Sequence, residues 1–265
     1  MLGKLLKYDL KSIFKFLAIF YSLAIVFAII TRILFKINDS LFLTILAYIF
    51  NGATIAMIAN ILINNLMRMW VYFKNNLYGD EGYLMHTLPV PRKNLFKAKF
   101  LTGLISFSVS TLVIISTMTI AWLTPENFEA LKSFLAPMAE LLDSTAIKIL
   151  FLTIFIVFLE ILSMLFSGLT GIILGHKKLN NRVAWSVLFG FICYITIQVI
   201  ILIGMLIMGK IDPEIGNSLF SSEQLLFPDI TVLKPVYLFS TITYFVLILV
   251  DYILSENWFK KINLD

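Results

Sequence analysis

Residues 147–174 read IKILFLTIFIVFLEILSMLFSGLTGIIL, and only Lys148 and Glu160 carry a charge in this stretch. A helix needs about 20 mostly apolar residues to cross the hydrocarbon core of a bilayer. The stretch exceeds that length, so it predicts a transmembrane helix.

The rest of the chain repeats this pattern. Of its 265 residues 60% are apolar and 14% are charged, whereas a soluble domain has about 45–50% and about 25%. This composition excludes a soluble enzyme and a disordered chain. We expect an all-α polytopic membrane protein, with residues 1–265 forming a single transmembrane domain. The other five spans are predicted at about 16–35, 41–66, 98–123, 185–208 and 236–254.

The distribution of Lys and Arg predicts the orientation. Six spans place both ends of the chain on one side of the membrane. That side has four Lys or Arg in residues 1–15, six in 67–99, three in 175–184 and two at the C-terminus, against six on the other side. Because basic loops stay in the cytoplasm, we expect both termini and the loops 67–97 and 175–184 to be cytoplasmic. The segment 209–235 is then an outer one.

Residues 1–15 differ from the spans. Lys4, Lys7, Lys11 and Lys15 fall on one side of a helix and apolar residues on the other. This pattern predicts an interfacial amphipathic helix whose lysines face anionic lipid. The alternative is the charged start of a signal peptide, but no clear cleavage site follows.

The first cytoplasmic loop has a pattern of its own. We expect a helical extension of the second span to Leu77, a break at Gly79 and a short segment over 80–88. The run Pro89-Val90-Pro91 then forces an extended turn.

Few residues fit known catalytic or metal-binding patterns. The stretch 204–211, GMLIMGKI, superficially resembles a phosphate-binding loop, but Ile211 replaces its Ser or Thr and no strand precedes it. The two histidines, His86 and His176, lie apart in loops, and Cys193 is the single cysteine. We therefore expect no metal site and no intrachain disulfide.

Glu160 lies near the centre of the fourth span. Acids inside a membrane are costly and often functional, so one interpretation is a polar patch on a translocation path. The other is a structural hydrogen bond to Gln198, Asn60 or Asn64.

Small residues recur every four positions in the same span, which lets another helix approach closely. The stripe is either a contact between subunits or packing within one chain. Its members are Ser163, Ser167, Gly171 and Gly175.

The layout and one motif resemble the permease subunits of ABC-2-type ABC exporters, in particular the small permeases of Gram-positive bacteria. The sequence EGYLMHTLPVPRK at 81–93 is similar to their first cytoplasmic loop, where GYLxxTLPV is typical. The ending KKINLD at 260–265 is similar to their KKLNLE tails. The interfacial start, six spans and longer first loop match the same family.

The resemblance implies a division of labour between subunits. ATP and magnesium bind to separate cytoplasmic ATPase subunits, and this chain is not an enzyme and holds no cofactor. A second permease copy or a homologous permease pairs with it in a bacterial plasma membrane, among membrane lipids and without nucleic acid. The short segment of the first loop corresponds to a coupling helix seated on the ATPase, and the second loop makes a smaller contact. The residues implied are Asp80, Glu81, Tyr83, Leu84, Leu88 and Arg92, then His176, Lys177 and Lys178.

The substrate implied by the resemblance is an amphiphile, such as an antimicrobial peptide or a lipid. The alternative is an energy-independent protein, namely a secondary transporter, a channel or a six-span substrate-binding subunit. Glu160 is its only support in the sequence.

Overall fold

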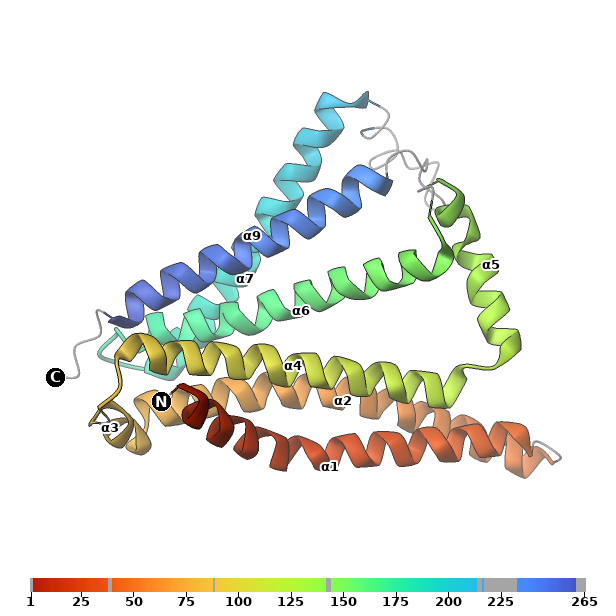
Figure 1. Cartoon of the computed structure of the whole chain (residues 1–265), viewed down its shortest axis with the longest axis horizontal. Coiled ribbons are helices and arrows are strands. Elements are labelled where there is room, and N and C mark those ends of the chain that lie inside the picture. Colours follow the sequence, from red (N-terminus) through yellow and green to blue (C-terminus); the bar gives the residue numbers. More distant parts are fainter. Residues whose placement is uncertain are drawn as a thin grey trace. The chain divides into compact units, whose positions relative to one another are not determined.

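The computed structural model describes residues 2–37, 40–87, 89–141, 144–213, 216 and 233–260, and this part of the chain contains helices and no strand. Figure 1 shows the helices in chain order. Their bounds are α1 (Leu2–Lys36), α2 (Leu41–Tyr78), α3 (Asp80–Thr87), α4 (Arg92–Trp122), α5 (Pro125–Leu141), α6 (Ala146–Gly175), α7 (Arg182–Ile211) and α9 (Leu233–Lys260).

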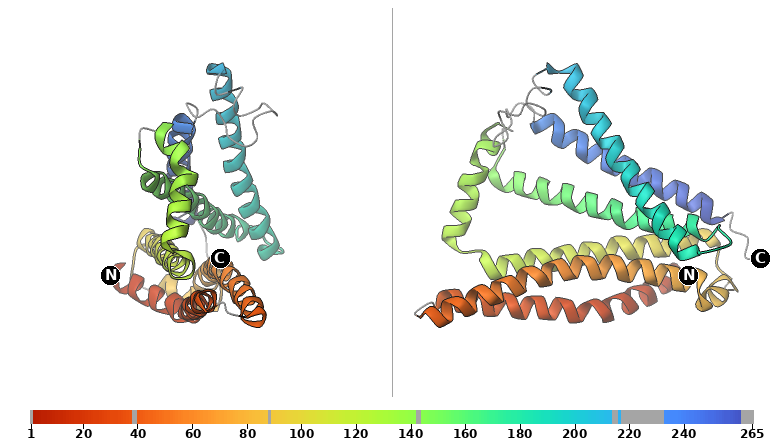
Figure 2. Two further views of the ribbon diagram at one scale, coloured as in Figure 1. Left: turned by 90° about the vertical axis from the view of Figure 1, so that its right-hand side faces the viewer. Right: turned by 180° about the vertical axis from the view of Figure 1, so that it is seen from behind.

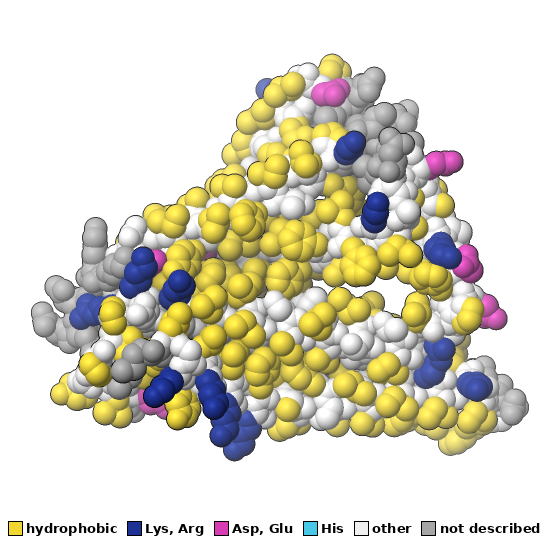
Figure 3. Space-filling view, in the orientation of Figure 1, with side chains coloured by type: hydrophobic (Ala, Val, Ile, Leu, Met, Phe, Trp, Pro, Cys, Tyr) yellow, Lys and Arg dark blue, Asp and Glu magenta, His cyan; other side chains and the backbone are white. Residues whose placement is uncertain are grey.

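Six of these helices, α1, α2, α4, α6, α7 and α9, are long and apolar enough to cross a membrane. The predicted all-α fold with six spans is therefore confirmed, and the chain is a multi-pass membrane protein. Apolar side chains cover much of the helix surface in Figure 3, with charged ones near the helix ends. Ile19, Phe151 and Leu202, for example, are 58%, 64% and 54% exposed, as expected of side chains that face lipid.

Residues 2–15 are the first turns of α1, which continues without interruption to Lys36. The lysine face expected there is exposed, whereas Asp9 and Ile13 on another face are buried. The structure thus gives one long helix where the sequence predicts an interfacial segment followed by a span.

The chain divides into two compact units, Met1–Asn127 and Phe128–Asp265. In the first unit α1 packs against both α2 and α4, as the ribbons in Figure 2 show. Small residues make this close packing possible, since Ala24 and Ala28 of α1 and Ala47 of α2 are fully buried. Thr31 and Thr54 add a buried hydrogen bond between α1 and α2, with 2.9 Å between their hydroxyl oxygens.

In the second unit α6 packs against α7 and α9, while α7 and α9 make only a small contact with each other. Gly171 of the small-residue stripe faces α7, where an added Cβ would collide with the backbone of Gly190 and lie 2.6 Å from the Ser186 carbonyl oxygen. Gly175 also lies against Ser186. Gly171 and Gly175 of the stripe therefore pack against α7 of the same chain.

Helix α5 lies in a loop that the sequence analysis left without structure. The Thr124 hydroxyl caps it by accepting a hydrogen bond from the Asn127 amide at 3.0 Å. Pro125 follows at the first helical position and Glu126 in the first turn, which is a typical helix start. Leu135 of α5 forms a small apolar cluster with Ile149 of α6. The other expected outer segment, 209–235, lies mostly outside the described residues.

We predict that Gly171→Ala destabilises the protein by about 1–3 kcal/mol, because the added methyl group forces two closely packed backbones apart. The matched control is Gly52→Ala on α2, where a Cβ would meet nothing within 4 Å. It should be neutral or slightly stabilising, since glycine weakens a helix by roughly 0.5–1 kcal/mol relative to alanine. Thermal unfolding in detergent measures both, and equal midpoints for the two variants would contradict the packing described here.

Candidate functional site

The junction of α2 and α3 forms a tight fold-back. α2 ends with the Gly79 amide donating to the Asn75 carbonyl oxygen at 3.1 Å, and the Gly82 amide then donates to the Gly79 carbonyl oxygen at 2.8 Å. Gly82 is buried, and a Cβ there would lie 2.8 Å from the carbonyl oxygen of Leu77. Glycine at 82 therefore lets α3 pack against the end of α2, and the helix break falls at Gly79, where the sequence places it.

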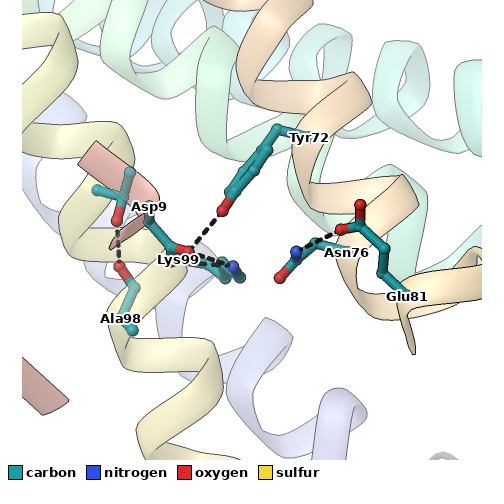
Figure 4. A network of polar contacts seen from close by, with 7 residues as sticks. Asp9, Tyr72, Asn76, Glu81, Ala98 and Lys99 are labelled. Atoms are coloured by element: carbon teal, nitrogen blue, oxygen red, sulfur yellow. Dashed lines mark hydrogen bonds and ion pairs between the residues drawn. The ribbon is translucent and has the colours of Figure 1, made fainter. Parts of the chain in front are cut away.

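A side-chain hydrogen bond closes the same junction. Asn76 Nδ2 of α2 donates to Glu81 Oε2 of α3 at 2.9 Å (Figure 4). The resemblance implies a role for Glu81 in the contact with the ATPase, and in the structure its carboxylate also fastens α3 to α2. Arg92, which the resemblance implies in the same contact, is half-buried at the start of α4.

The opposite face of α3 is apolar and open. Tyr83 and Leu84 are 78% and 67% exposed. Among the other coupling residues implied by the resemblance, Asp80 begins α3, while its side chain and the whole of Leu88 lie outside the described residues. An eight-residue helix is too short to be stable in water by itself, so its packing on α2 is what presents these two side chains.

A buried ion pair lies close to this junction. Lys99 Nζ of α4 is 2.8 Å and 2.9 Å from the two carboxylate oxygens of Asp9 of α1. The Tyr72 hydroxyl of α2 donates to Asp9 Oδ1 at 2.7 Å, and Lys99 Nζ lies 4.6 Å from the centroid of the Tyr72 ring. Asp9 and Lys99 are only 3% and 1% exposed. Three helices thus meet at one charge pair (Figure 4).

The ion pair and the junction are connected through α2. Tyr72 and Asn76 are one helical turn apart, so one face of α2 contacts Asp9 at Tyr72 and Glu81 at Asn76. Short polar contacts therefore link α3 with α1, α2 and α4.

The sequence analysis missed this ion pair. It counted Lys99 only as a basic residue before a span and did not use Asp9. One signal was present, because Asp9 is the only acid in residues 1–15 and shares a helical face with the buried Ile13 and Leu17.

The second loop is held within its own unit. His176 Nδ1 lies 2.8 Å from the Ile172 carbonyl oxygen. The ammonium groups of Lys177 and Lys178 lie over the rings of Trp258 and Trp185, 5.5 Å and 5.3 Å from the centroids. Leu179 between them and α7 is 90% exposed.

The asparagines proposed as partners of Glu160 bond elsewhere. Asn60 Nδ2 donates to the Ala56 carbonyl oxygen and Asn64 Nδ2 to the Asn60 carbonyl oxygen, both at 2.9 Å along α2. The neighbouring Asn65 does connect two helices, because it donates to Ser110 Oγ of α4 at 2.6 Å. Gln198 Nε2 is buried without a hydrogen-bond partner among the described residues.

The second unit holds another intramembrane acid that the sequence analysis did not single out. The Thr170 hydroxyl of α6 donates to Asp251 Oδ1 of α9 at 2.6 Å and lies 2.6 Å from Ser255 Oγ. This polar contact ties α9 to α6.

Among the described residues no three His, Cys, Asp or Glu side chains are grouped to hold a metal ion. Comparison with protein-family models, with curated proteins and with solved structures finds no match. The function is therefore argued from the residues themselves.

We predict that Asp9→Asn lowers the free energy of unfolding by about 3–5 kcal/mol, because Lys99 then remains buried without a charged partner. Replacing both residues, as Asp9→Leu with Lys99→Met, should restore most of the loss. The control is Glu129→Gln on α5, which removes the ion pair between Glu129 and Lys132. The nitrogen and oxygen of this pair are 2.7 Å apart, close to the 2.8 Å of the Asp9–Lys99 pair, but the two side chains are exposed. The loss should therefore be less than about 1 kcal/mol.

Unfolding by denaturant in detergent micelles measures these differences. An Asp9→Asn protein as stable as the Glu129→Gln protein would show that the buried pair does not hold the three helices together.

Proposed function

We propose that this chain is the permease subunit of an ATP-driven exporter of the ABC-2 type. It pairs with a second permease, identical or homologous, to form the path of an amphiphilic substrate such as an antimicrobial peptide or a lipid. Separate cytoplasmic ATPase subunits bind ATP and magnesium and supply the energy. The resemblance of residues 81–93 to the first loop of such permeases motivates this proposal.

The observation that carries the proposal is α3. It is a short helix, fixed to α2 by Gly82 and by the Asn76–Glu81 hydrogen bond, with Tyr83 and Leu84 exposed side by side. Such a pair suits a helix-in-groove contact, in which a partner covers the apolar face of a short helix. Its rigid attachment suits a part that transmits movement.

The length of α2 supports a position for α3 outside the lipid. Its 38 residues extend about 57 Å at 1.5 Å per residue, compared with about 30 Å of hydrocarbon. The excess of Lys and Arg in the loops on this side favours the cytoplasm. A cytoplasmic ATPase can then reach α3 without entering the membrane.

The only stretch of the sequence that resembles a phosphate-binding loop lies at the end of α7. Residues 204–211, which superficially resemble a phosphate-binding loop, are the last turns of α7. A P-loop instead follows a strand, and its backbone amides are free to bind phosphate. Hydrolysis in a partner therefore fits this chain better than hydrolysis within it.

The mechanism follows from the contacts around α3. Closure of the ATPase pair moves α3, and the hydrogen bond from Asn76 to Glu81 passes this movement to α2. The buried pair of Asp9 and Lys99 makes α1 and α4 move with it. The first unit then shifts as one body and opens a route for the substrate to the outside.

The test is to look for a P-loop ATPase without spans in an adjacent reading frame, and then to measure its co-purification with this chain and the stimulation of its ATPase activity. The double variant Tyr83→Ala, Leu84→Ala should lose at least tenfold in affinity, because the apolar contact is gone. Glu81→Ala should assemble more weakly, since α3 is no longer fixed to α2.

The matched control is Leu41→Ala with Phe42→Ala at the other end of α2. These two residues are also adjacent, and they are 80% and 70% exposed. The control should assemble as the wild type does. Equal assembly and equal ATPase stimulation in all the variants would remove α3 from the coupling contact.

A further inference from the structure

Arg68 of α2 carries a charge that the described part of the chain does not pair. Its guanidinium group lies over the ring of Phe16 of α1, with Cζ 5.2 Å from the ring centroid. Arg68 Nε is buried, and no described atom accepts a hydrogen bond from it. The side chain as a whole is only half-buried, so the terminal nitrogens can still be reached. A guanidinium has five N–H donors, and a ring face offers them no oxygen acceptor.

Arg32 shows the contrast at the other end of α1. Arg32 Nη1 donates to the Leu123 carbonyl oxygen at 2.9 Å, so this arginine finds an acceptor inside the protein. For Arg68 the acceptor has to come from outside the described chain.

The position of Arg68 along α2 indicates what that acceptor is. The apolar stretch of α2 ends at residue 66, and Trp70 follows two residues after Arg68. Tryptophan is enriched where a helix leaves the hydrocarbon core, at the level of the lipid headgroups. Arginine binds phosphate through two parallel N–H···O hydrogen bonds. A phospholipid phosphate therefore lies at the right depth and has the right geometry.

The neighbouring surface of α1 is basic and has no competing acid. Asp9 is the only acid in residues 2–15, and it is withdrawn from the surface because it is 3% exposed and lies 2.8 Å from Lys99 Nζ. Figure 3 shows Lys and Arg side chains grouped over the first turns of α1. The exposed cations of this segment are Lys4, Lys7, Lys11 and Lys15.

Two of these lysines lie close to the stacked arginine along the chain. Lys15 directly precedes Phe16, and Lys11 lies one turn before Lys15 on the same face of α1. Two flexible ammonium groups therefore start within two helical turns of the ring that carries the guanidinium group.

We propose that Arg68, with Lys15 and Lys11, binds the phosphate of an anionic phospholipid such as phosphatidylglycerol. The terminal nitrogens of Arg68 donate to two phosphate oxygens. The two lysines favour a headgroup with a net negative charge over a zwitterionic one. The acyl chains lie along α1 and α2, where Ile19 and Ile63 are each 58% exposed.

This site gives the basic face of α1 a defined phosphate contact and ties one lipid to the α1–α2 pair. It goes beyond the proposed function and does not depend on it, because all of its residues belong to the first unit and none belongs to α3.

The test measures lipid binding to the full chain in detergent by native mass spectrometry, with phosphatidylglycerol as the anionic probe and phosphatidylcholine as the zwitterionic one. We expect the wild type to bind the first phosphatidylglycerol molecule about tenfold more tightly than phosphatidylcholine, and Arg68→Gln to lose about fivefold of this preference. The matched control is Lys97→Gln, which removes an exposed cation from α4 and should keep the wild-type preference.

A second variant keeps the test decisive if Arg68→Gln does not fold. Lys11→Gln with Lys15→Gln changes only exposed side chains, so this protein should fold and lose at least as much of the preference. Inorganic phosphate should not displace the lipid, since it lacks the acyl chains that lie along the helices.

Three results would overturn the proposal. One is a wild type that binds both lipids equally. Another is the wild-type preference in a folded Arg68→Gln protein or in the double lysine variant. The third is displacement of phosphatidylglycerol by inorganic phosphate, which would replace the lipid with a soluble anion as the ligand.

Discussion

The hydrocarbon core of a bilayer offers no hydrogen-bond partners, so each polar group that enters it has to be satisfied inside the protein. This constraint explains why the spans are helices, whose backbones satisfy themselves. It also explains the many hydroxyl groups that bond to their own helix, such as Thr117 Oγ1 donating to the Val113 carbonyl oxygen at 2.8 Å. Between helices the same requirement brings Asn65 to Ser110 and Asp9 to Lys99.

The two units meet this constraint differently. In the first unit the buried acid has a cation, a tyrosine hydroxyl and a nearby junction to α3, which together make a stiff body. In the second unit Asp251 accepts a hydrogen bond from Thr170 and ties α9 to α6, while α7 and α9 make few contacts with each other. A stiff first unit suits the transmission of movement from α3.

The sequence predicted what depends on local pattern. Long apolar stretches gave the six spans, and Gly79 with the two prolines gave the break and the turn around α3. Thr124, Pro125 and Glu126 also form a typical helix start, from which the beginning of α5 could have been predicted. The pairing of Asp9 with Lys99, 90 residues apart, was not readable, because it depends on how α1, α2 and α4 pack. For the same reason the sequence offered Asn60 and Asn64 as partners of Glu160, although both asparagines bond along α2.

The central claim is that this chain moves its substrate only when a separate subunit drives it. The most direct measurement is transport of a fluorescent amphiphile across the membrane of proteoliposomes that contain the purified chain alone, compared with proteoliposomes that contain the chain, its ATPase and ATP. The account predicts no transport above empty liposomes for the chain alone, and ATP-dependent transport once the ATPase is added. Sustained transport by the chain alone, without nucleotide or partner, would contradict it.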